Sequence, residues 1–300
     1  MNEILINLFD LQPLKDLWQF DGPAYLFTVL IVFIVAKLIY DLLTPFKLNK
    51  QLTEADNKAV AVSFSGYLMA VAIIIFGIMS TEPAASEEFS KSDFYKDLLA
   101  TVIWSIIGIL LLNIARIIND KLLLRKFDNT KELVTDKNVG TGAVLWGSYV
   151  GSALIIRSAI MGEDSGFVNG IITTLIYFII GQLGFIVFAW IYQKISRYDL
   201  HAEIERDNVA AGVAFGLTLT AIAILLSGYI ARYDSLPGFL AWFVISLFFI
   251  VVSRYIVDKF ILPGALLDDE ISHDQNWGAA LIEGGVAIGL ALLLVPVFLD

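Results

Sequence analysis

The stretch NVGTGAVLWGSYVGSALIIRSAIM, from Asn138 to Met161, decides the fold of this chain. After its polar first residue it carries a single charge, on Arg157. A bilayer core about 30 Å thick requires roughly 20 apolar residues of helix, so the stretch is long enough to cross it. Gly147 and Gly151 stand one helical turn apart, a spacing that lets two helices approach closely in lipid. The stretch therefore predicts a membrane-spanning helix that packs tightly against another helix.

The rest of the chain has the same character. Of its 300 residues, 58% are hydrophobic and 17% are charged, whereas a soluble domain has about 45–50% and about 25%. This composition argues strongly against a soluble enzyme. Apolar segments long enough to span are expected at 24–43, 59–80, 98–115, 139–161, 170–192, 209–231, 236–253 and 277–299. They are too long and too uniformly apolar for barrel strands, which predicts an all-α polytopic membrane protein with eight transmembrane helices.

The even-numbered spans repeat one pattern. Each begins at an asparagine that closely follows an aspartate, and the four asparagines are Asn57, Asn138, Asn208 and Asn276. The second span aligns without gaps to the sixth, and the third and fourth align to the seventh and eighth at one constant offset. The repeating unit is thus a helical hairpin, and four hairpins make two four-helix halves, at 23–162 and 163–300. Because each half has an even number of spans, the halves are expected to be parallel.

Charge predicts the orientation of the chain. Lysine and arginine gather in the connections after the first, third, fifth and seventh spans, and this bias marks the cytoplasmic side. Both termini are therefore expected outside the cytoplasm. Residues 1–22 are expected as an extracytoplasmic segment, either an amphipathic helix on the outer surface or a loosely ordered tail. No basic region precedes the first span, so we expect a retained helix and not a removed signal peptide.

This four-fold pattern resembles a known family. An asparagine, then small residues and Gly-x-x-x-Gly, on a four-span half, is similar to the pattern of the YjfL-like bacterial inner-membrane proteins, which carry domain of unknown function 350, often in tandem. The resemblance covers most of 24–299, twice over. It implies this fold and a location in the bacterial inner (plasma) membrane, but no reaction. Some members are associated with envelope-stress proteins, which implies partners of that kind. The chain departs from the pattern at Lys58, Trp277, Ala61 and Ser65.

The repeated residues allow two interpretations each. Gly147 and Gly151 in one half are equivalent to Gly285 and Gly289 in the other. They predict close helix packing, and the alternative is a groove for a ligand or a second protomer. The four asparagines are expected to act as N-caps, each contributing about 1 kcal/mol. Their alternative role is a polar ring at the cytoplasmic mouth that binds water or a cation.

Three charged residues are the candidate functional groups inside the membrane: Glu283, Arg254 and Arg116. Glu283 lies roughly 10 Å into the eighth span at 1.5 Å per residue. A lone carboxylate in lipid costs several kcal/mol, so we expect it to face the bundle interior, protonated or paired with one of the two arginines. The alternative is a proton or cation relay. Each arginine also precedes an aspartate by one turn, Asp258 or Asp120, with which it could form a local ion pair.

Two classes of function remain open. The first is a non-enzymatic membrane partner or scaffold, linked to envelope stress by the resemblance alone. The second is a small-molecule or ion carrier or channel, for cations or protons, that uses Glu283. A continuous water-accessible path through this carboxylate would favour the carrier, and a dry interior would favour the scaffold.

Other classes are disfavoured. The sequence contains no nucleotide-binding loop, no zinc-protease motif and no evident nucleophile–base set, so no enzyme activity is expected. Without cysteine and with two histidines, no metal and no cofactor are expected. A net charge of −10 argues against nucleic acid as a partner. The expected partners are the lipid bilayer and either further copies of the chain or other membrane and envelope-stress proteins.

Overall fold

The computed structural model describes residues 21–80, 91–161 and 166–299. Within these ranges, eight helices are long and apolar enough to cross a membrane. They are α3 Asp21–Leu43, α4 Lys58–Met79, α5 Lys91–Leu122, α7 Val139–Ile160, α8 Phe167–Ile195, α10 Val209–Ile230, α11 Leu236–Ile256 and α13 Trp277–Leu299. The prediction of an all-α protein with eight transmembrane helices is confirmed.

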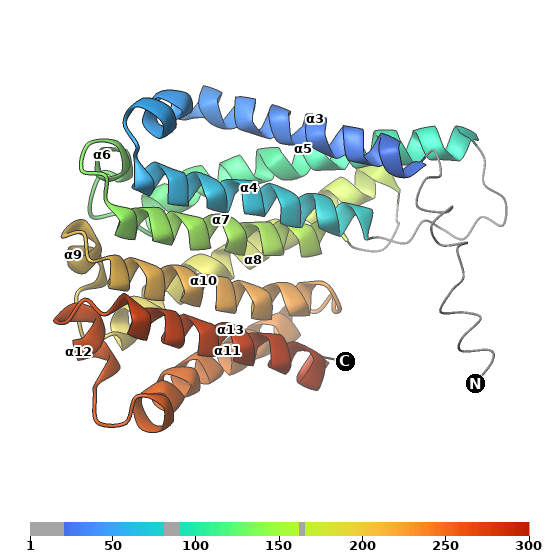
Figure 1. Cartoon of the computed structure of the whole chain (residues 1–300). Coiled ribbons are helices and arrows are strands. Elements are labelled where there is room, and N and C mark those ends of the chain that lie inside the picture. Colours follow the sequence, from blue (N-terminus) through green and yellow to red (C-terminus); the bar gives the residue numbers. More distant parts are fainter. Residues whose placement is uncertain (1–20, 81–90, 162–165, 300) are drawn as a thin grey trace, which may run out of the picture.

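Short helical segments precede the even-numbered spans. They are η1 Lys50–Glu54, α6 Asn129–Val134, α9 Leu200–Glu205, η2 Val257–Ile261 and α12 Leu267–Ser272. Figure 1 shows α6, α9 and α12 gathered at one end of the bundle, where α7, α10 and α13 begin. This end corresponds to the side that the lysine and arginine bias predicts to be cytoplasmic.

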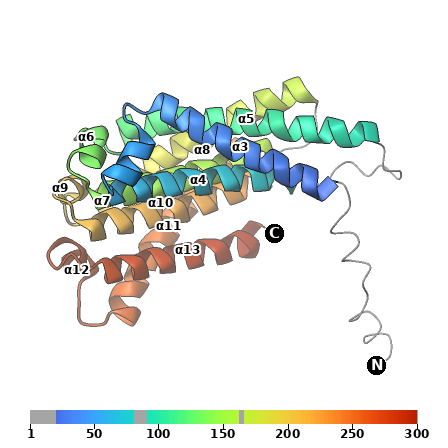
Figure 2. The ribbon, with the colours of Figure 1, turned by 45° about the horizontal axis from the view of Figure 1, so that its top comes forward.

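The second, fourth, sixth and eighth spans form one row. They are the helices α4, α7, α10 and α13, and they are called even-numbered by their order among the eight spans and not by their labels. α4 packs against α7, α7 against α10 and α10 against α13, and these are the most extensive contacts among the described residues. Figure 1 shows the four helices side by side and parallel, in chain order. The third, fifth and seventh spans, α5, α8 and α11, lie along this row. Each contacts two neighbouring helices of the row: α5 contacts α4 and α7, α8 contacts α7 and α10, and α11 contacts α10 and α13. α3 lies outermost, against α5 and α4 (Figure 2).

The row explains which spans are buried. α7 and α10 have another helix of the row on each side, and most of their residues are buried. α4 and α13 stand at the two ends of the row, and each has such a neighbour on one side within the chain. Much of α13 is therefore exposed, including the apolar side chains of Leu292 and Val297.

A distinctive turn starts each even-numbered span. The residue before each asparagine has a positive φ, which is uncommon for residues other than glycine. These residues are Asp56, Lys137, Asp207 and Gln275, with φ of 47°, 54°, 63° and 49°. The recurrence of one unusual turn at four equivalent places shows the four-fold repeat in three dimensions.

The helix ends differ from the predicted ones. α5 runs from Lys91 to Leu122 and not over 98–115, and α8 runs from Phe167 to Ile195 and not over 170–192. The helical backbone continues past the apolar stretch because charged residues are compatible with helix outside the lipid core. Most of the predicted amphipathic segment 1–22 lies outside the described residues.

Candidate functional site

The second half contains a buried cluster of charged groups. On α11, Nη1 of Arg254 lies 2.6 Å from Oε1 of Glu283 on α13. Nη2 of the same arginine lies 2.6 Å from Oδ1 of Asp268, at the start of α12. The hydroxyl of Tyr192 on α8 donates to Oε1 of Glu283 at 3.0 Å and accepts a hydrogen bond from Arg254 at 2.8 Å. One arginine therefore joins two carboxylates from two different elements.

A backbone bond places Asp268 in this cluster. The N–H of Leu267 donates to Oδ1 of Asp258 at 2.8 Å, which fixes the first turn of α12 beside the end of α11. The described ion pairs of Arg254 are with Glu283 and Asp268, so the local ion pair expected with Asp258 is absent. Nothing in the spacing of Asp268 in the sequence indicates that the chain folds back to bring it beside Arg254.

Glu283 faces the bundle interior, as predicted. It is 1% exposed, and Arg254 is 7% exposed. A buried charge requires an opposite charge beside it, and this pair satisfies that requirement. Oε2 of Glu283 has no hydrogen-bond partner in the described part of the chain. The arrangement is suited to a structural tie, because a proton relay would require Glu283 to leave the always-charged guanidinium.

Arg116 is the first-half equivalent of Arg254, and it lies apart from this cluster. Its Nη2 donates to the carbonyl oxygen of Leu43 at 2.9 Å. Over the described ranges it forms no ion pair with Asp120, so the expected local pair is absent. Of the two candidate arginines, the structure thus brings Arg254 to Glu283.

The four asparagines act as N-caps, as predicted. Oδ1 of each accepts a hydrogen bond from a backbone N–H in the first turn of its helix. These distances are 3.1, 2.9, 3.2 and 3.1 Å for Asn57, Asn138, Asn208 and Asn276. Such a bond satisfies an amide that the helix leaves without a partner. The asparagines are therefore spread along the row as caps and do not form the alternative polar ring.

The asparagine side chains have a second role that the sequence did not reveal. Nδ2 of Asn57, Asn138 and Asn208 donates to a carbonyl oxygen in the short segment of the next repeat. The acceptors are Leu133, Ile204 and Ile271, at 2.7, 2.6 and 2.8 Å. Asn276, in the last repeat, donates to Glu270 of its own repeat at 2.8 Å. Each of the first three asparagines therefore ties its repeat to the following one.

The two glycine pairs differ in their surroundings. A Cβ atom at Gly147 would overlap the backbone of Gly216 on α10, and one at Gly151 would lie 2.8 Å from an aromatic ring of α8. These two glycines allow close packing, as predicted. At Gly285 and Gly289, a Cβ atom would meet no described atom within 4 Å. The packing expected there is not found among the described residues, because no described helix of the row lies beyond α13.

A polar network also joins the two halves inside the bundle. Nε2 of Gln182 on α8 donates to Oδ1 of Asn119 on α5 at 2.6 Å. Nδ2 of Asn119 in turn donates to the hydroxyls of Ser148 and Ser152 on α7, at 2.9 and 3.1 Å. Hydrogen bonds of this kind hold helices together in lipid. The sequence around Asn119 does not indicate this network, because the partners of Asn119 lie far away in the chain.

The chain matches one family model twice. The family is described as Domain of Unknown Function (DUF350), and the matches cover residues 17–160 and 166–298. Two successive copies thus account for nearly all of the sequence. No solved structure matches the chain.

Curated relatives include both long and short proteins. The UPF0719 transmembrane protein of Aquifex aeolicus (strain VF5) is 23% identical over 273 residues, which are 88% of this chain and 95% of the relative. The UPF0719 transmembrane protein YshE of Bacillus subtilis (strain 168) is 24% identical over 126 residues, 42% of this chain and 92% of the relative. The UPF0719 inner membrane protein YjfL of Escherichia coli (strain K12) is 32% identical over 114 residues, 37% of this chain and 85% of the relative. The last two relatives have about the length of one half.

Proposed function

The chain belongs to the DUF350 family of transmembrane proteins, and we propose that it is a non-enzymatic membrane scaffold. In this proposal it assembles with further copies of itself through the two open ends of its row of helices. The observation that carries the proposal is the side chain of Asn276, which over the described residues lacks the bond to a following repeat that its three equivalents make.

Successive helices of the row use the same two faces. In the row α4, α7, α10, α13, we call the side of a helix that packs on the following helix of the row its forward face. The opposite side is its backward face. Forward-face Gly66 of α4 meets Trp146 of α7, and forward-face Gly147 of α7 meets Gly216 of α10. On α10, Leu217 meets backward-face Gly284 of α13. These three contacts link equivalent positions of the repeat.

In the part of the chain that the structure describes, both ends of the row leave one of these faces uncovered. On α13, the forward-face position equivalent to Gly66 and Gly147 is Gly285, where a Cβ atom would meet no described atom within 4 Å. On α4, the backward-face residues Ala61, Ser65 and Met69 are exposed. Ser65 stands where Trp146 and Gly216 stand in later repeats. A second copy that places its α4 on α13 would therefore continue the row with the contact that the chain already uses.

The asparagine bonds support the same partner. Leu133 and Ile271, which accept from the preceding asparagines, stand at the same place relative to Asn138 and Asn276. In the first repeat this place is held by Leu52, which is partly exposed. The carbonyl position of Leu52 at one end thus complements Asn276 at the other.

The half-length relatives are consistent with this proposal. In this chain, the contact of α7 with α10 joins the first half to the second. Relatives of about one half in length have no second half in the same chain. If they use the same contact, it must join separate molecules.

Cross-linking of introduced cysteines tests the proposal, because the natural chain has none. Nζ of Lys137 donates to the carbonyl of Ala55 at 2.7 Å across the first junction. The equivalent positions at a junction between copies are Asp56 and Asp274. A mixture of Asp56→Cys and Asp274→Cys proteins in liposomes should give a dimer with a short bismaleimide, and the double variant should give a ladder.

Variants on the open face provide the controls. Gly285→Leu places a bulky side chain on the forward face and should abolish the ladder. Ala100→Leu, at an exposed alanine of α5, should leave it unchanged. A dimer from Asp274→Cys alone would indicate a symmetric pair of α13 helices instead. Absence of a ladder, or a ladder that Gly285→Leu does not alter, would contradict head-to-tail assembly.

A cation or proton carrier is the second candidate function. The observation that favours it is the acidic group inside the membrane, with Oε2 of Glu283 unpaired among the residues described. Its burial and its bond to Arg254 favour the scaffold. A measurement of proton and cation flux in proteoliposomes distinguishes the two.

A further inference from the structure

Each half contains an arginine stacked on a tyrosine at equivalent places. In the second half, the guanidinium carbon of Arg254 lies 5.4 Å from the ring centre of Tyr192. In the first half, the guanidinium carbon of Arg116 lies 5.4 Å from the ring centre of Tyr40. The tyrosines belong to the first span of each half and the arginines to the third. Both halves therefore contain the same pairing of an arginine with a tyrosine.

The two sites differ in the groups that face the arginine. In the second half, Glu283 and Asp268 supply carboxylates. When the repeats are aligned at their asparagines, the place of Glu283 is held by Leu145 and that of Asp268 by Thr130. The first half therefore has the cation without either of these two carboxylates.

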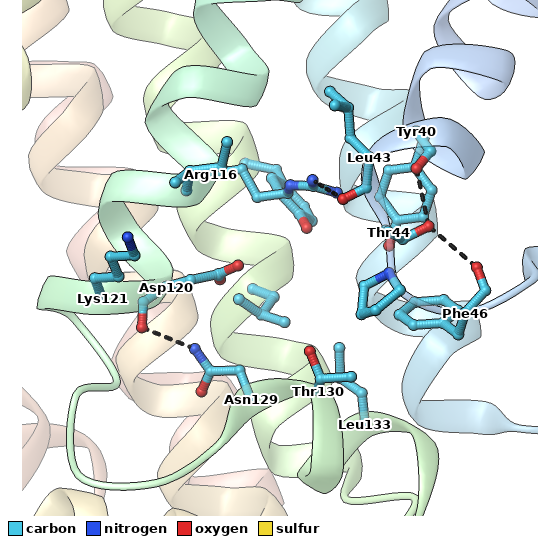
Figure 3. A pocket seen from close by; sticks show the side chains of 14 residues that line it. Tyr40, Leu43, Thr44, Phe46, Arg116, Asp120, Lys121, Asn129, Thr130 and Leu133 are labelled. Atoms are coloured by element: carbon cyan, nitrogen blue, oxygen red, sulfur yellow. Dashed lines mark hydrogen bonds between the residues drawn. The ribbon is translucent and has the colours of Figure 1, made fainter.

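A cavity lies beside this cation. It has a volume of about 190 Å³, and Arg116, Leu145, Thr130 and Tyr40 are among its lining residues. Figure 3 shows it between the end of α5, the end of α3 and α6. Arg116 is 6% exposed, and its Nε has no hydrogen-bond partner in the described segments. A guanidinium that is buried and incompletely bonded thus faces a space lined by the counterparts of the two acids.

We propose that this cavity binds an oxyanion, a phosphate or carboxylate group, which faces Arg116 as Glu283 faces Arg254. Charged groups within a membrane protein are paired, and a guanidinium forms strong, directional bonds to these two groups in particular. The exposed side chain of Lys121 at the same cavity adds a second positive charge.

One lining residue opposes anion binding. Asp120 also lines the cavity, beyond ion-pair distance of Arg116, and its Oδ1 has no hydrogen-bond partner among the described groups. A carboxylate there repels a second anion at short range. The Asp120→Asn variant should therefore bind an anion more tightly than wild type. The test thus includes one variant that strengthens binding as well as one that abolishes it.

Two sources supply the same chemistry. The cavity is formed by the ends of α3 and α5, at the end of the bundle where the short helices gather. A phospholipid headgroup could enter it from the bilayer, and a soluble phosphate or carboxylate could enter it from the aqueous side. The experiment uses phosphatidylglycerol and inorganic phosphate as separate probes.

The test measures the unfolding temperature of the full-length protein. The protein is placed in phosphatidylcholine nanodiscs, with phosphatidylglycerol added to the lipid or with inorganic phosphate added to the buffer. A ligand that binds the folded state raises this temperature. Wild type should show the rise with at least one probe, and Arg116→Gln should lose it. Asp120→Asn should reach half of the maximal rise at a several-fold lower probe concentration.

The repeat itself supplies the decisive variant. Leu145→Glu introduces the carboxylate that the second half has, so the unliganded protein should become more stable and the probe should cease to act. Leu145→Gln, its uncharged match, should keep the response. A rise with phosphatidylglycerol alone identifies a lipid headgroup, and a rise with inorganic phosphate identifies a soluble anion. No rise with either probe, or an equal rise in wild type and in Arg116→Gln, overturns the proposal even if Leu145→Glu does not fold.

Discussion

Nη1 of Arg254 and Oε1 of Glu283 lie 2.6 Å apart, on the last two spans of the chain. Both side chains are buried, so the contact ties α11 to α13 away from water. Asp268 from outside the span reaches the same guanidinium. The stability of the C-terminal hairpin should therefore depend on the arginine more than on either acid.

We expect Arg254→Leu to lower the free energy of unfolding by about 3–5 kcal/mol, because it leaves Glu283 buried without a counter-charge. The double variant Arg254→Leu with Glu283→Leu should recover much of this loss, since an apolar pair can replace a buried ion pair. Unfolding in mixed detergent micelles measures both. A double variant as unstable as Arg254→Leu alone would show that the pair is not the cause.

Gly147 and Gly285 are equivalent positions with different surroundings, so the effects of replacing each by leucine can be compared directly. Gly147→Leu should destabilise the fold by several kcal/mol, because a side chain there would overlap the backbone of Gly216. Gly285→Leu should leave the isolated molecule within about 0.5 kcal/mol of wild type, because its side chain has open space. Unfolding in a detergent that keeps the protein monomeric compares the two. Equal losses would contradict the open face of α13.

Acid should weaken the short helix α9. His201 is 8% exposed, and its Nε2 lies 2.8 Å from the carbonyl oxygen of Leu123. Burial lowers its pKa below the usual value, which is about 6.5. Below about pH 6.5 the unfolded state binds more protons than the folded state, so this stability is present at higher pH and falls as the pH falls.

This effect appears as a slope of the unfolding temperature between about pH 5 and pH 8. His201→Gln should flatten the slope over the acidic part of the range. His273→Gln, at a histidine whose side chain is 78% exposed, should leave it as in wild type. A slope that both variants share would assign the acid sensitivity to other groups.

Flux measurements separate the scaffold from the carrier. We expect proteoliposomes with wild type to pass protons and monovalent cations no faster than vesicles without protein, because Glu283 is 1% exposed and bonded to Arg254. Glu283→Gln should behave in the same way. An added ionophore confirms that the vesicles are tight. Flux in wild type that Glu283→Gln abolishes would support the carrier and contradict the scaffold.

Much of the fold could be predicted from composition and repetition. Long apolar stretches determine the number of spans, and the recurrence of Asn57, Asn138, Asn208 and Asn276 identifies the hairpin unit. The burial of Glu283 followed from the cost of a carboxylate in lipid. These inferences succeeded because they depend on local sequence and on the properties of the bilayer.

The details of the site could not be predicted in the same way. Asp268 reaches Arg254 because Asp258 holds the first turn of α12, and nothing in the order of residues reveals this fold-back. The Gly-x-x-x-Gly pairs look alike in sequence, yet Gly147 is covered by α10 and no described atom covers Gly285. Whether a helix face is covered depends on the place of its helix in the row.

Each asparagine that joins two repeats does so through the same cap and through a carbonyl oxygen in the short segment of the next repeat. No junction between hairpins therefore demands a specialised sequence of its own. A gene for such a protein could gain or lose a hairpin by duplication or deletion without redesigning the interior. The curated relatives of about half this length are consistent with such gain or loss.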